Sequence, residues 1–546
     1  MTAEAPRGFR GVFRSDDSAR AVYAEAAGIA RIWPKAVAVA ADADDVATIV
    51  RWASDTRQPL IPRGSGSSMA GGAIGDGVVL DLSRLRALSD VDVARRSIRA
   101  EVGVLRGELN RHASANRTDG GKLRFPVDPS SGEFCTIGGM TATNAAGPHS
   151  LLHGAMRRWV VAVDCVFDDG SRATIRRGEP LRTGVPAVRR FVQHAAPVLL
   201  KQNPGIECPR VIKNSSGYGT DAYAESHELV DLLVGSEGTL AVFTAVEVAL
   251  TPVAGASASV LVSFRDLERA VEAAVASRDQ GASACELLDR TFLTIAAKAG
   301  RPLPVSSDAE AALLVEIEAS HSTAATAQID LLRDLFRKLD AADLIVAGEG
   351  GATQEAELWS FRHAASPAIA RMDASLRSMQ FIEDAAVPPT QLAAYVRDVR
   401  SILEKAETTG VIFGHAGDAH VHVNPLLNVG QPDWRARVER ILLEVTDLVA
   451  RLGGTLTGEH GDGRLRTPLM SRIWSSPAIE QFALLKRIFD PAGIFNPGVK
   501  VPLPGQRAID VVKYDPTLEA LPAPARSALE TVERERAYSR FRLDLL

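Results

Sequence analysis

The segment PRGSGSSMAGG, residues 62–72, concentrates glycine and serine at the end of the short apolar stretch PLIP. Because glycine carries no side chain, such a loop lets backbone N–H groups approach an anionic group closely. The loop lacks the Gly-Lys-Ser/Thr ending of a P-loop. Met69 occupies the third glycine position of a Rossmann fingerprint, and a strand rather than a long helix is expected to follow. The loop therefore disfavours both of these nucleotide-binding folds, and a flexible surface turn is the alternative to an anion-binding loop.

The length and composition of the chain narrow the classes of protein further. With 546 residues it exceeds what one hydrophobic core accommodates, so two or three domains are expected. The formal net charge is −5 and no Lys/Arg run occurs, so no nucleic-acid partner is expected. The four cysteines lie far apart in sequence, which excludes a local metal knuckle or iron–sulfur run and argues against a disulfide framework.

The same features predict where the chain functions. Its first residues contain no apolar signal segment, and no apolar run reaches the length of a membrane span. With few cysteines as well, we expect a cytoplasmic protein without an integral membrane segment. Peripheral attachment at the inner membrane stays open, and the sequence does not decide between a monomer and a homodimer.

Short apolar stretches alternate with amphipathic helical stretches along the chain, which predicts an α+β fold. Residues 36–68 are expected to form a strand, a helix capped by Asp42, a second strand and the glycine loop. Near residue 254 the pattern changes to strands followed by amphipathic helices. The expected division is an N-terminal segment 1–31, a first domain 32–252, a second domain 253–470, a segment 471–502 and an extension 503–546 packed on the surface.

Three further segments rich in glycine and small polar residues accompany the first loop, namely residues 127–147, 211–221 and 232–244. Together the four segments resemble the flavin-binding domain of the vanillyl-alcohol oxidase and p-cresol methylhydroxylase (PCMH) superfamily. The resemblance implies a two-subdomain PCMH-type FAD-binding domain, followed by a substrate or cap domain with an antiparallel sheet. It also implies that the C-terminal segment returns to the FAD-binding domain.

In this superfamily the first loop wraps the FAD pyrophosphate, and the second and fourth segments line the flavin and the adenosine. The resemblance therefore implies that FAD contacts Pro62, Arg63, Gly64, Ser65, Gly66, Ser67, Ser68, Pro129, Ser130, Gly138, Gly139, Asn144, Glu237, Gly238, Val242 and Asn496. Because residues 62–72 include no His, Cys or Tyr, we expect the FAD to be non-covalently bound. The turn SLLHG, residues 150–154, departs from the Arg/Lys-Tyr-Gly ending of many relatives, so the contacts made by this turn are not implied.

Histidine is concentrated in two motifs, GHAGDAHVHVN (residues 414–424) and GEHGDGRLR (residues 458–466), although the chain has only 11 histidines. If AHVHVN is a strand, His420, His422 and Asn424 point to one face. Imidazole and carboxylate groups together suit a divalent transition metal such as Zn or Mn. Satisfied polar residues at a loop-rich domain edge are the alternative.

Both histidine motifs resemble the paired signatures of the FAD-linked D-2-hydroxyacid dehydrogenases, the group that holds D-lactate and D-2-hydroxyglutarate dehydrogenases. The resemblance implies that His415, His422 and Glu459 are metal ligands and that His460 is the catalytic base. Relatives usually have Gly-Asn-x-His where this chain has AHVH, residues 419–422. His420 is therefore either an added ligand or a polar neighbour.

The segment ELWSFRHAASPAI, residues 357–369, resembles the Trp-x-x-Arg helix of the same family. The resemblance places Arg362 at the substrate carboxylate and Ser366 one turn further on, and Asn424 is also expected at the substrate. A guanidinium suits a carboxylate because it offers a planar, bidentate fork. A surface ion pair is the alternative role for this arginine.

These expectations combine into an FAD- and divalent-metal-dependent dehydrogenase that oxidises a D-2-hydroxy acid, with D-lactate as the first candidate, to the 2-oxo acid. A metal at the substrate hydroxyl lowers its pKa, an imidazole takes the proton, and the Cα hydrogen leaves as hydride to the flavin N5. An external protein or quinone is expected to accept the electrons. The alternatives are a D-2-hydroxyglutarate dehydrogenase, a flavin subunit of a glycolate or hydroxyacid oxidase complex, and a hydrolase that uses the His/Glu cluster alone.

Overall fold

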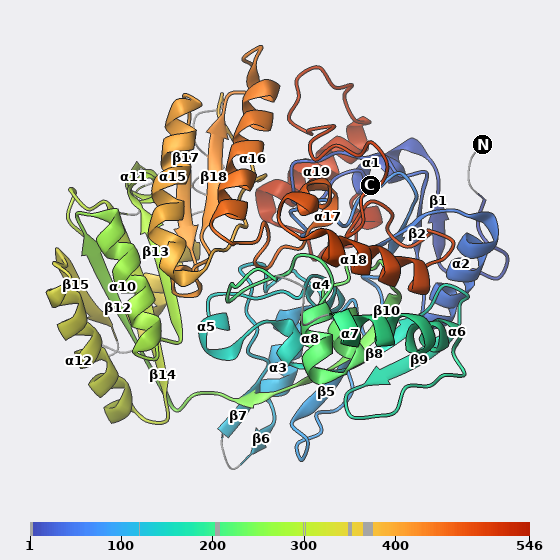
Figure 1. Cartoon of the computed structure of the whole chain (residues 1–546), viewed down its shortest axis with the longest axis horizontal. Helices are drawn as coiled ribbons and strands as arrows, with labels where there is room; N and C mark the ends of the chain where they lie inside the picture. Colours follow the sequence, from blue (N-terminus) through green and yellow to red (C-terminus); the bar gives the residue numbers. More distant parts are fainter. Residues whose placement is uncertain are drawn as a thin grey trace.

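The computed structural model describes residues 4–118, 121–202, 208–298, 300, 302–347, 352–363 and 375–546. Figure 1 shows two halves, one built from the blue to green N-terminal elements and one from the green to orange elements that follow. The red C-terminal elements lie with the first half. Within the described residues the strands form sheets of four, four, three and seven strands.

The first sheet leads the chain into the glycine loop. Its strands, in spatial order, are β1 (Val12–Arg14), β2 (Ala36–Val39), β4 (Val78–Asp81) and β3 (Leu60–Arg63). β2 and β3 run parallel to β4, and helix α2 (Ala43–Thr56) connects β2 to β3. Asp42 caps this helix as predicted, because its side chain accepts hydrogen bonds from the backbone N–H groups of Asp44 and Asp45. β3 ends at Arg63, so the loop begins at the edge of the sheet.

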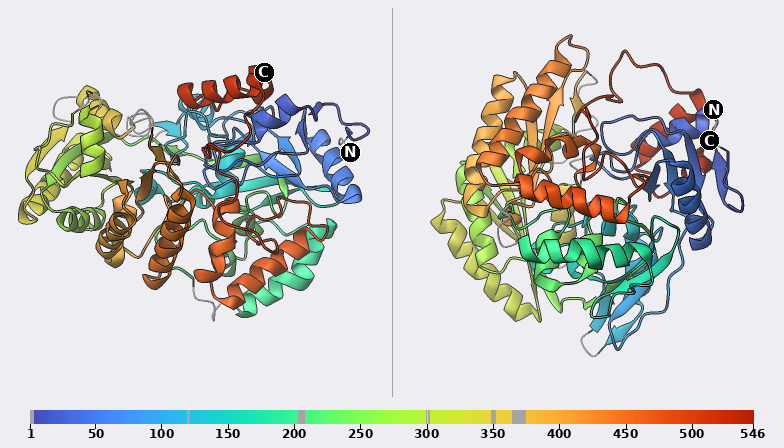
Figure 2. Two further views of the ribbon diagram at one scale, coloured as in Figure 1. Left: turned by 90° about the horizontal axis from the view of Figure 1, so that it is seen from above. Right: turned by 45° about the vertical axis from the view of Figure 1, so that its right-hand side comes forward.

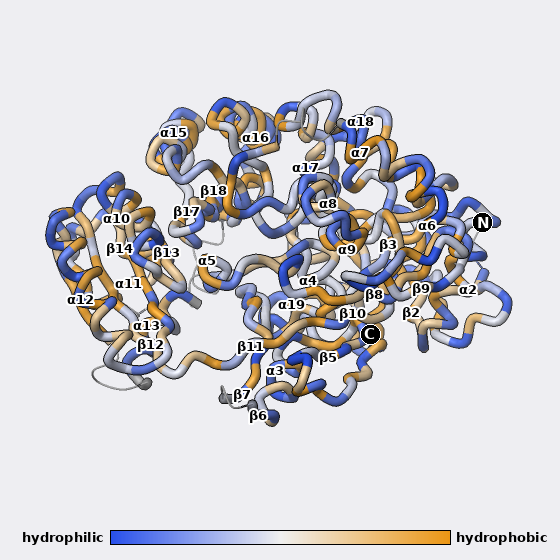
Figure 3. Tube along the Cα trace, turned by 60° about the horizontal axis from the view of Figure 1, so that its bottom comes forward, coloured by the Kyte–Doolittle hydropathy of each residue, from blue (hydrophilic) through white to orange (hydrophobic). Residues whose placement is uncertain are grey.

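The second sheet is antiparallel and shares a hydrophobic core with the first. Its strands, in spatial order, are β5 (Ser97–Glu101), β10 (Val242–Ala249), β8 (Val160–Val166) and β9 (Arg172–Arg176). A small sheet of β11 (Thr251–Pro252), β7 (Gly121–Arg124) and β6 (Arg117–Thr118) extends from it. Figure 3 shows that β8 and β10 are largely hydrophobic, as expected of buried strands.

Most helices of this half surround the two larger sheets. They are α3 (Arg106–Ser114), α4 (Ile137–Thr143), α5 (Ser150–His153), α6 (Pro186–Arg190), α7 (Ala196–Gln202), α8 (Thr220–Ser226) and α9 (Leu229–Leu233). The side chain of Thr136 accepts a hydrogen bond from the backbone N–H of Gly139 and so caps α4. The second glycine-rich segment therefore becomes a short helix that packs against β10.

The second half is built on a seven-stranded sheet in which all neighbouring strands are antiparallel, as the sequence predicts. The strands, in spatial order, are β15 (Asp343–Ala347), β12 (Ala256–Phe264), β14 (Ala311–Ala319), β13 (Ala284–Asp289), β17 (Thr409–Gly414), β18 (His422–Leu427) and β16 (Arg377–Ser378). Alternate residues of β12 enter different cores: Val260 and Val262 lie on one face and Leu261 on the other.

Amphipathic helices cover both faces of this sheet. The face of Val260 packs against α10 (Leu267–Asp279), α12 (Ser322–Lys338), α15 (Leu392–Lys405) and α16 (Trp434–Arg451). The face of Leu261 packs against α11 (Arg290–Lys298) and α13 (Ala352–His363). Because α13 contains Arg362, this packing fixes where the predicted carboxylate-binding arginine lies.

After the second histidine motif the chain returns to the first half, as the sequence predicts. Helix α17 (Gly463–Arg466) forms the end of the motif, and α18 (Ser476–Phe489) places Phe482, Leu485 and Phe489 in the core shared by the first two sheets. Beyond α18, Phe495 forms a β-bridge with Leu60 of β3. The histidine motif is therefore held between two segments that belong to different halves.

The C-terminal extension packs against the N-terminal elements through an apolar face, whose side chains belong to a buried core. Helix α19 (Ala523–Glu535) buries Ala525, Ala528 and Leu529 against α1 (Asp17–Tyr23) and the first sheet. Figure 2 shows the red C-terminal helix beside the blue N-terminal elements. Among the residues that the structure describes, no helix is both long enough and apolar enough to cross a membrane.

A charged contact joins the two halves. The Nδ1 atom of His149 lies 2.6 Å from a carboxylate oxygen of Asp128, and its Nε2 lies 2.8 Å from a carboxylate oxygen of Glu316 on β14. Burial opposes protonation of His149, but the two carboxylates outweigh it and raise its pKa to about 11. The imidazole is therefore charged at neutral pH and bridges the halves.

We expect His149→Asn to destabilise the protein more at about pH 6 than at about pH 9. Because the folded-state pKa is raised, the stabilisation from His149 is complete below the pKa of the unfolded chain, roughly 6.5, and is lost as the pH rises through the folded-state value. Thermal unfolding of wild type and variant across this range measures the difference. His112→Asn, on α3 and away from the junction, is the control. A difference that does not change with pH would contradict this role.

Candidate active site

A cavity of about 1080 Å³ is lined by residues of both predicted sites. Most of the predicted cofactor contacts line it, namely Pro62, Arg63, Gly64, Ser65, Gly66, Ser67, Ser68, Pro129, Ser130, Gly138, Gly139, Glu237 and Gly238. Five residues predicted to bind substrate or metal or to act in catalysis also line it, namely Arg362, His422, Asn424, Glu459 and His460. The glycine loops and the histidine motifs therefore open into one space, which is large enough for a cofactor.

Three predicted cofactor contacts lie behind this wall. Asn144 ends α4 with a left-handed φ of 52°, and its side-chain oxygen accepts a backbone N–H at 2.9 Å. Val242 is fully buried at the start of β10. Asn496 donates from Nδ2 to the carbonyl oxygens of Gly72 and Glu237 at 2.9 and 2.8 Å. The side-chain oxygen of Asn144 and the side-chain amide of Asn496 form hydrogen bonds within the protein, and Val242 is buried. These residues therefore support the cavity wall without facing the cavity. The predicted substrate contact Ser366 lies outside the described residues.

Glycine is required in the first loop because its backbone packs against other groups at close range. A Cβ at Gly66, where φ is +75°, would lie 2.3 Å from an Nη atom of Arg63. A Cβ at Gly64 would lie 2.3 Å from the hydroxyl oxygen of Thr136, which begins the second glycine-rich segment. The two segments therefore meet at Gly64, where a side chain would displace Thr136, and Gly66 adopts a backbone conformation that favours glycine.

Glu237 of the fourth segment joins this wall to the second histidine motif. Its carboxylate accepts hydrogen bonds from the backbone N–H groups of Asp462 and Gly463 at 2.7 and 3.1 Å, and it pairs with Lys500 at 3.0 Å. Burial raises the pKa of Glu237, and Lys500 opposes that shift. The loop from Gly458 to Gly463 is thus held in place by a residue of the opposite half of the protein.

The three predicted metal ligands converge on one oxygen atom. Oε1 of Glu459 lies 3.3 Å from Nε2 of His415 and 3.7 Å from Nε2 of His422. His415 follows β17, His422 begins β18, and Glu459 comes from the loop after α16. Burial and the neighbouring imidazoles hold the pKa of His422 well below its usual value. His422 is therefore neutral, which is the form of imidazole that binds a metal.

His420 does not occupy the strand predicted for it. β18 begins only at His422, because Ala419 adopts a left-handed conformation with φ of 54° and interrupts the extended chain before it. His420 instead lies in an isolated bridge with Ala386, and its Nε2 is 2.9 Å from a carboxylate oxygen of Asp384. Its Nδ1 has no hydrogen-bond partner among the described residues. Together His415, His420 and Glu459 form one of the groups close enough to share an ion.

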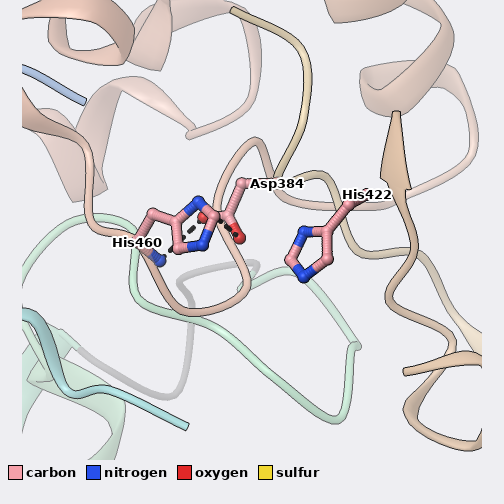
Figure 4. Close-up of side chains that lie close together, drawn as sticks. All are labelled: Asp384, His422 and His460. Carbon is pink, nitrogen blue, oxygen red and sulfur yellow. Dashed lines mark hydrogen bonds and ion pairs between the residues drawn. The ribbon is translucent and has the colours of Figure 1, made fainter. Parts of the chain in front are cut away.

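His460 lies between two carboxylates and the proposed ligands. Its Nδ1 is 3.3 Å from Glu383 and 3.5 Å from Asp384, and its Nε2 is 3.8 Å from Glu459. Its ring is parallel to that of His422, with the centroids 5.3 Å apart, and Figure 4 shows it beside the Asp384 carboxylate. Burial lowers the pKa of His460, but Asp384 and Glu383 outweigh this and raise it to about 9.

The carboxylates beside His460 come from a distant segment of the chain and not from its neighbour in sequence, Asp462. Asp462, which is only two residues away in the chain, is turned toward Lys500 at 2.9 Å and toward the hydroxyl of Ser216 at 2.8 Å. Glu383 and Asp384 come instead from a loop before α15. The sequence gives one indication of their role, because these two acidic residues lie inside the apolar stretch FIEDAAV. Burying an ionised carboxylate costs free energy unless it has a cation or a hydrogen-bond donor beside it, so such a pair needs partners.

Arg362 is buried at the cavity and oriented by a third unpredicted carboxylate. Its Nε donates to Glu286 of β13, and its guanidinium carbon lies 5.0 Å from the ring centre of Phe413. One Nη atom has no hydrogen-bond partner within the described part of the chain. The other carboxylate oxygen of Glu286 lies 2.5 Å from Nδ1 of His415. Glu286 thus links the predicted carboxylate-binding residue to a predicted metal ligand.

Lys213, from the third glycine-rich segment, is a buried cation that the sequence did not assign to the site. Its ammonium nitrogen lies 3.1 Å from Asp418, 3.3 Å from Glu459 and 3.1 Å from the carbonyl oxygen of Gly147. Burial opposes the charge on Lys213, but the carboxylates keep its pKa raised. Lys213 therefore compensates part of the negative charge around the histidines.

Residues 34–176 match the FAD binding domain family, and residues 254–499 match the family of FAD linked oxidases, C-terminal domain. The chain is 28% identical over 493 residues to the glycolate oxidase subunit GlcD of Bacillus subtilis, which covers 89% of this chain and 93% of that protein. It is 29% identical over 465 residues to a D-lactate dehydrogenase of Archaeoglobus fulgidus, which covers 84% of this chain and 89% of that protein.

The fold resembles that of p-cresol methylhydroxylase with substrate bound, with a TM-score of 0.65, 12% identity, and coverage of 90% of this chain and 94% of that chain. At this identity the similarity concerns the fold alone, and it confirms the predicted PCMH-type architecture. The sequence matches identify the chemistry more closely. The chain belongs to the FAD-linked oxidoreductases, in the group of D-lactate dehydrogenases, D-2-hydroxyglutarate dehydrogenases and glycolate oxidase subunits that act on 2-hydroxy acids.

Proposed function

We propose that the protein is an FAD- and divalent-metal-dependent dehydrogenase that oxidises a D-2-hydroxy acid, with D-lactate as the first candidate, to the 2-oxo acid. One observation carries the proposal: the flavin-type loops and the side chains of Arg362, His422, Glu459 and His460 line the same cavity. A hydrolase that used only the His/Glu cluster would have no need of these loops. The electrons would pass to an external acceptor such as a protein or a quinone.

The residues present fit both groups. The backbone of residues 62–68 faces the cavity, and this loop carries no His, Cys or Tyr, which supports non-covalent FAD. Five carboxylates of the site share three Lys and Arg side chains: Glu286, Glu383, Asp384, Asp418 and Glu459 pair with Arg362, Lys213 and Arg466. This excess of negative charge favours a divalent cation, held by His415, His422 and Glu459.

When bound, FAD would accept hydride from the substrate Cα and the metal would lower the pKa of the substrate hydroxyl. Arg362 would hold the substrate carboxylate with its unpaired Nη atom, while Glu286 fixes the orientation of the guanidinium. His460 would take the hydroxyl proton on Nε2 in its neutral form, with Glu383 and Asp384 next to its Nδ1. The two carboxylates raise its pKa, and the charge of a bound metal would oppose that rise and favour the neutral imidazole. Asn424, in the cavity wall, would contact the substrate.

His460→Ala should retain FAD and metal but slow flavin reduction by about 10²–10⁴-fold, the usual contribution of a positioned acid or base. Anaerobic stopped-flow mixing with the active hydroxy acid measures this rate through the loss of oxidised-flavin absorbance. Arg472→Ala, an exposed residue after the same motif, is the control. Reduction of the His460→Ala flavin at the wild-type rate would show that the proton leaves by another route.

A second substrate, D-2-hydroxyglutarate, is favoured by one observation. Arg377 of β16 also lines the cavity, so a second cation is available for the distal carboxylate of a diacid.

A screen of D-lactate, D-2-hydroxyglutarate and glycolate with an artificial dye acceptor tests both candidates. If the diacid is the substrate, Arg377→Ala should raise its KM by roughly two- to fivefold, the range for an ion pair of an exposed arginine, and leave the KM for D-lactate unchanged. An equal rise in KM for D-lactate and for D-2-hydroxyglutarate would exclude this role of Arg377.

Glu286→Gln should weaken metal retention by roughly 10–100-fold, as expected when the partner that orients a metal-binding histidine is lost. The variant should also raise the KM for the hydroxy acid, because Arg362 loses its charged partner. Elemental analysis after dialysis and steady-state kinetics measure the two effects.

His420→Asn, which restores the residue usual in relatives, is the matched control and should keep its metal. Loss of metal from this control would make His420 a ligand. Unchanged metal retention and KM in Glu286→Gln would remove Glu286 from the site, and active wild-type enzyme without stoichiometric metal would refute the ligand set.

A further inference from the structure

The last residues of the chain lie against the glycine loop. Beyond the family match, which ends at residue 499, α19 and the segment after it supply Glu530, Glu533, Arg534, Glu535, Arg536 and Tyr538 to the wall of the same cavity. Glu533 pairs with Lys513 and Glu535 with Arg534, so cations compensate two of these three carboxylates. Helix α19 and the segment after it meet the part of the wall formed by the first two glycine-rich segments. The ring of Tyr538 lies 5.2 Å from that of Phe134, and the guanidinium of Arg536 lies 5.0 Å from the same ring.

Arg542 contacts the first glycine-rich loop and so connects the C-terminal segment to it. Its side chain is buried, one Nη donates to the carbonyl oxygen of Ser65 at 3.4 Å, and its guanidinium carbon lies 5.2 Å from the centre of the Tyr538 ring. Its Nε and other Nη atom have no hydrogen-bond partner in the described part of the protein.

Arg63 lies within the same loop, and part of its buried guanidinium also lacks hydrogen-bond partners. Its Nε and one Nη atom have no partner among the described residues, and they lie beneath Gly66. The nearby carboxylate of Asp81 already accepts from the hydroxyl of Tyr23 and from the backbone N–H of Ser83. Burial and the charge of Arg63 lower the pKa of Arg542 to about 10. Two partly unpaired guanidiniums thus make the loop electropositive, which favours an anionic ligand on it.

We propose that residues 534–542 are part of the cofactor site and bind the adenosine diphosphate half of FAD. Arg536 and Tyr538 contact this half directly, and Arg542 with Arg63 supplies positive potential beneath the loop that holds the pyrophosphate. The flavin half must meet the substrate, so it lies toward Arg362 and His460. The adenosine end then extends toward the wall formed by Phe134 and the C-terminal segment. The proposal depends on FAD binding and not on the identity of the hydroxy acid.

FAD affinity in Tyr538→Ala tests the proposal. Serial dilution of the holoenzyme, followed by the rise in free-flavin fluorescence, gives the dissociation constant for FAD. Displacement by ADP and by FMN then reports separately on the two halves of the cofactor. We expect Tyr538→Ala to weaken the binding of both FAD and ADP by roughly tenfold, because an aromatic ring stacked on a base contributes at least about that much to affinity. Displacement of FAD by FMN should be unchanged.

Three further variants distinguish loss of cofactor recognition from loss of folding. Tyr538→Phe keeps the ring and should bind FAD as the wild type does, and Arg526→Ala, on an exposed position of α19, should have no effect. Arg542→Gln should accelerate FAD release from the holoenzyme. The proposal is overturned if Tyr538→Ala binds FAD and ADP as wild type does, if FMN is weakened as much as FAD, or if ADP fails to displace FAD from the wild type. None of these measurements depends on turnover.

Discussion

An ionised carboxylate is costly to bury unless cations or hydrogen-bond donors surround it, and this protein buries several around its histidines. Glu459 is held by Lys213 and by His415, Glu286 by Arg362 and His415, and Glu383 by Arg466. Each partner comes from a distant part of the chain. Removing one member of such a pair strands the other, which typically costs about 3–5 kcal/mol. The geometry of the site and the folding of the surrounding core are therefore linked.

The same constraint explains why the two halves form one site. The second histidine motif belongs to neither half alone, because Glu237 accepts hydrogen bonds from its backbone and Lys500 pairs with both Glu237 and Asp462. Asn496 adds a third connection by bonding to the carbonyl oxygen of Glu237. In the proposed mechanism these contacts would set the position of the histidines relative to the flavin, which requires more precision than hydrophobic packing between the halves supplies.

The sequence predicted those features that depend on local chemistry. The cap at Asp42, the amphipathic helices, the antiparallel sheet and the loops that line the cavity follow from periodicity, turn residues and motif resemblance. The two motifs also bring His415, His422 and Glu459 together, and their role as metal ligands stays a prediction. Charge partners such as Glu286 and Asp384 were missed, because they are distant in the sequence and nothing local indicates which cation each one meets. The packing partners of the C-terminal tail were not predicted for a related reason: its apolar positions are spaced like those of an ordinary amphipathic helix, and the residues of α1 and the first sheet that they contact are distant in the sequence.

Glu286 would also orient the protein groups that contact the carboxylate and the hydroxyl of the substrate. One of its oxygens accepts from Arg362 and the other lies against Nδ1 of His415. With Nδ1 turned toward Glu286, His415 presents Nε2 toward Glu459, the atom needed for a metal ligand. In the proposed mechanism, one carboxylate would therefore orient both the group that binds the substrate carboxylate and a ligand of the metal at the substrate hydroxyl. Since these two substrate groups are attached to the same carbon, a shift of Glu286 would disturb both contacts at once. For this reason the consequences of altering Glu286 should exceed those of altering a residue that contacts only one of them.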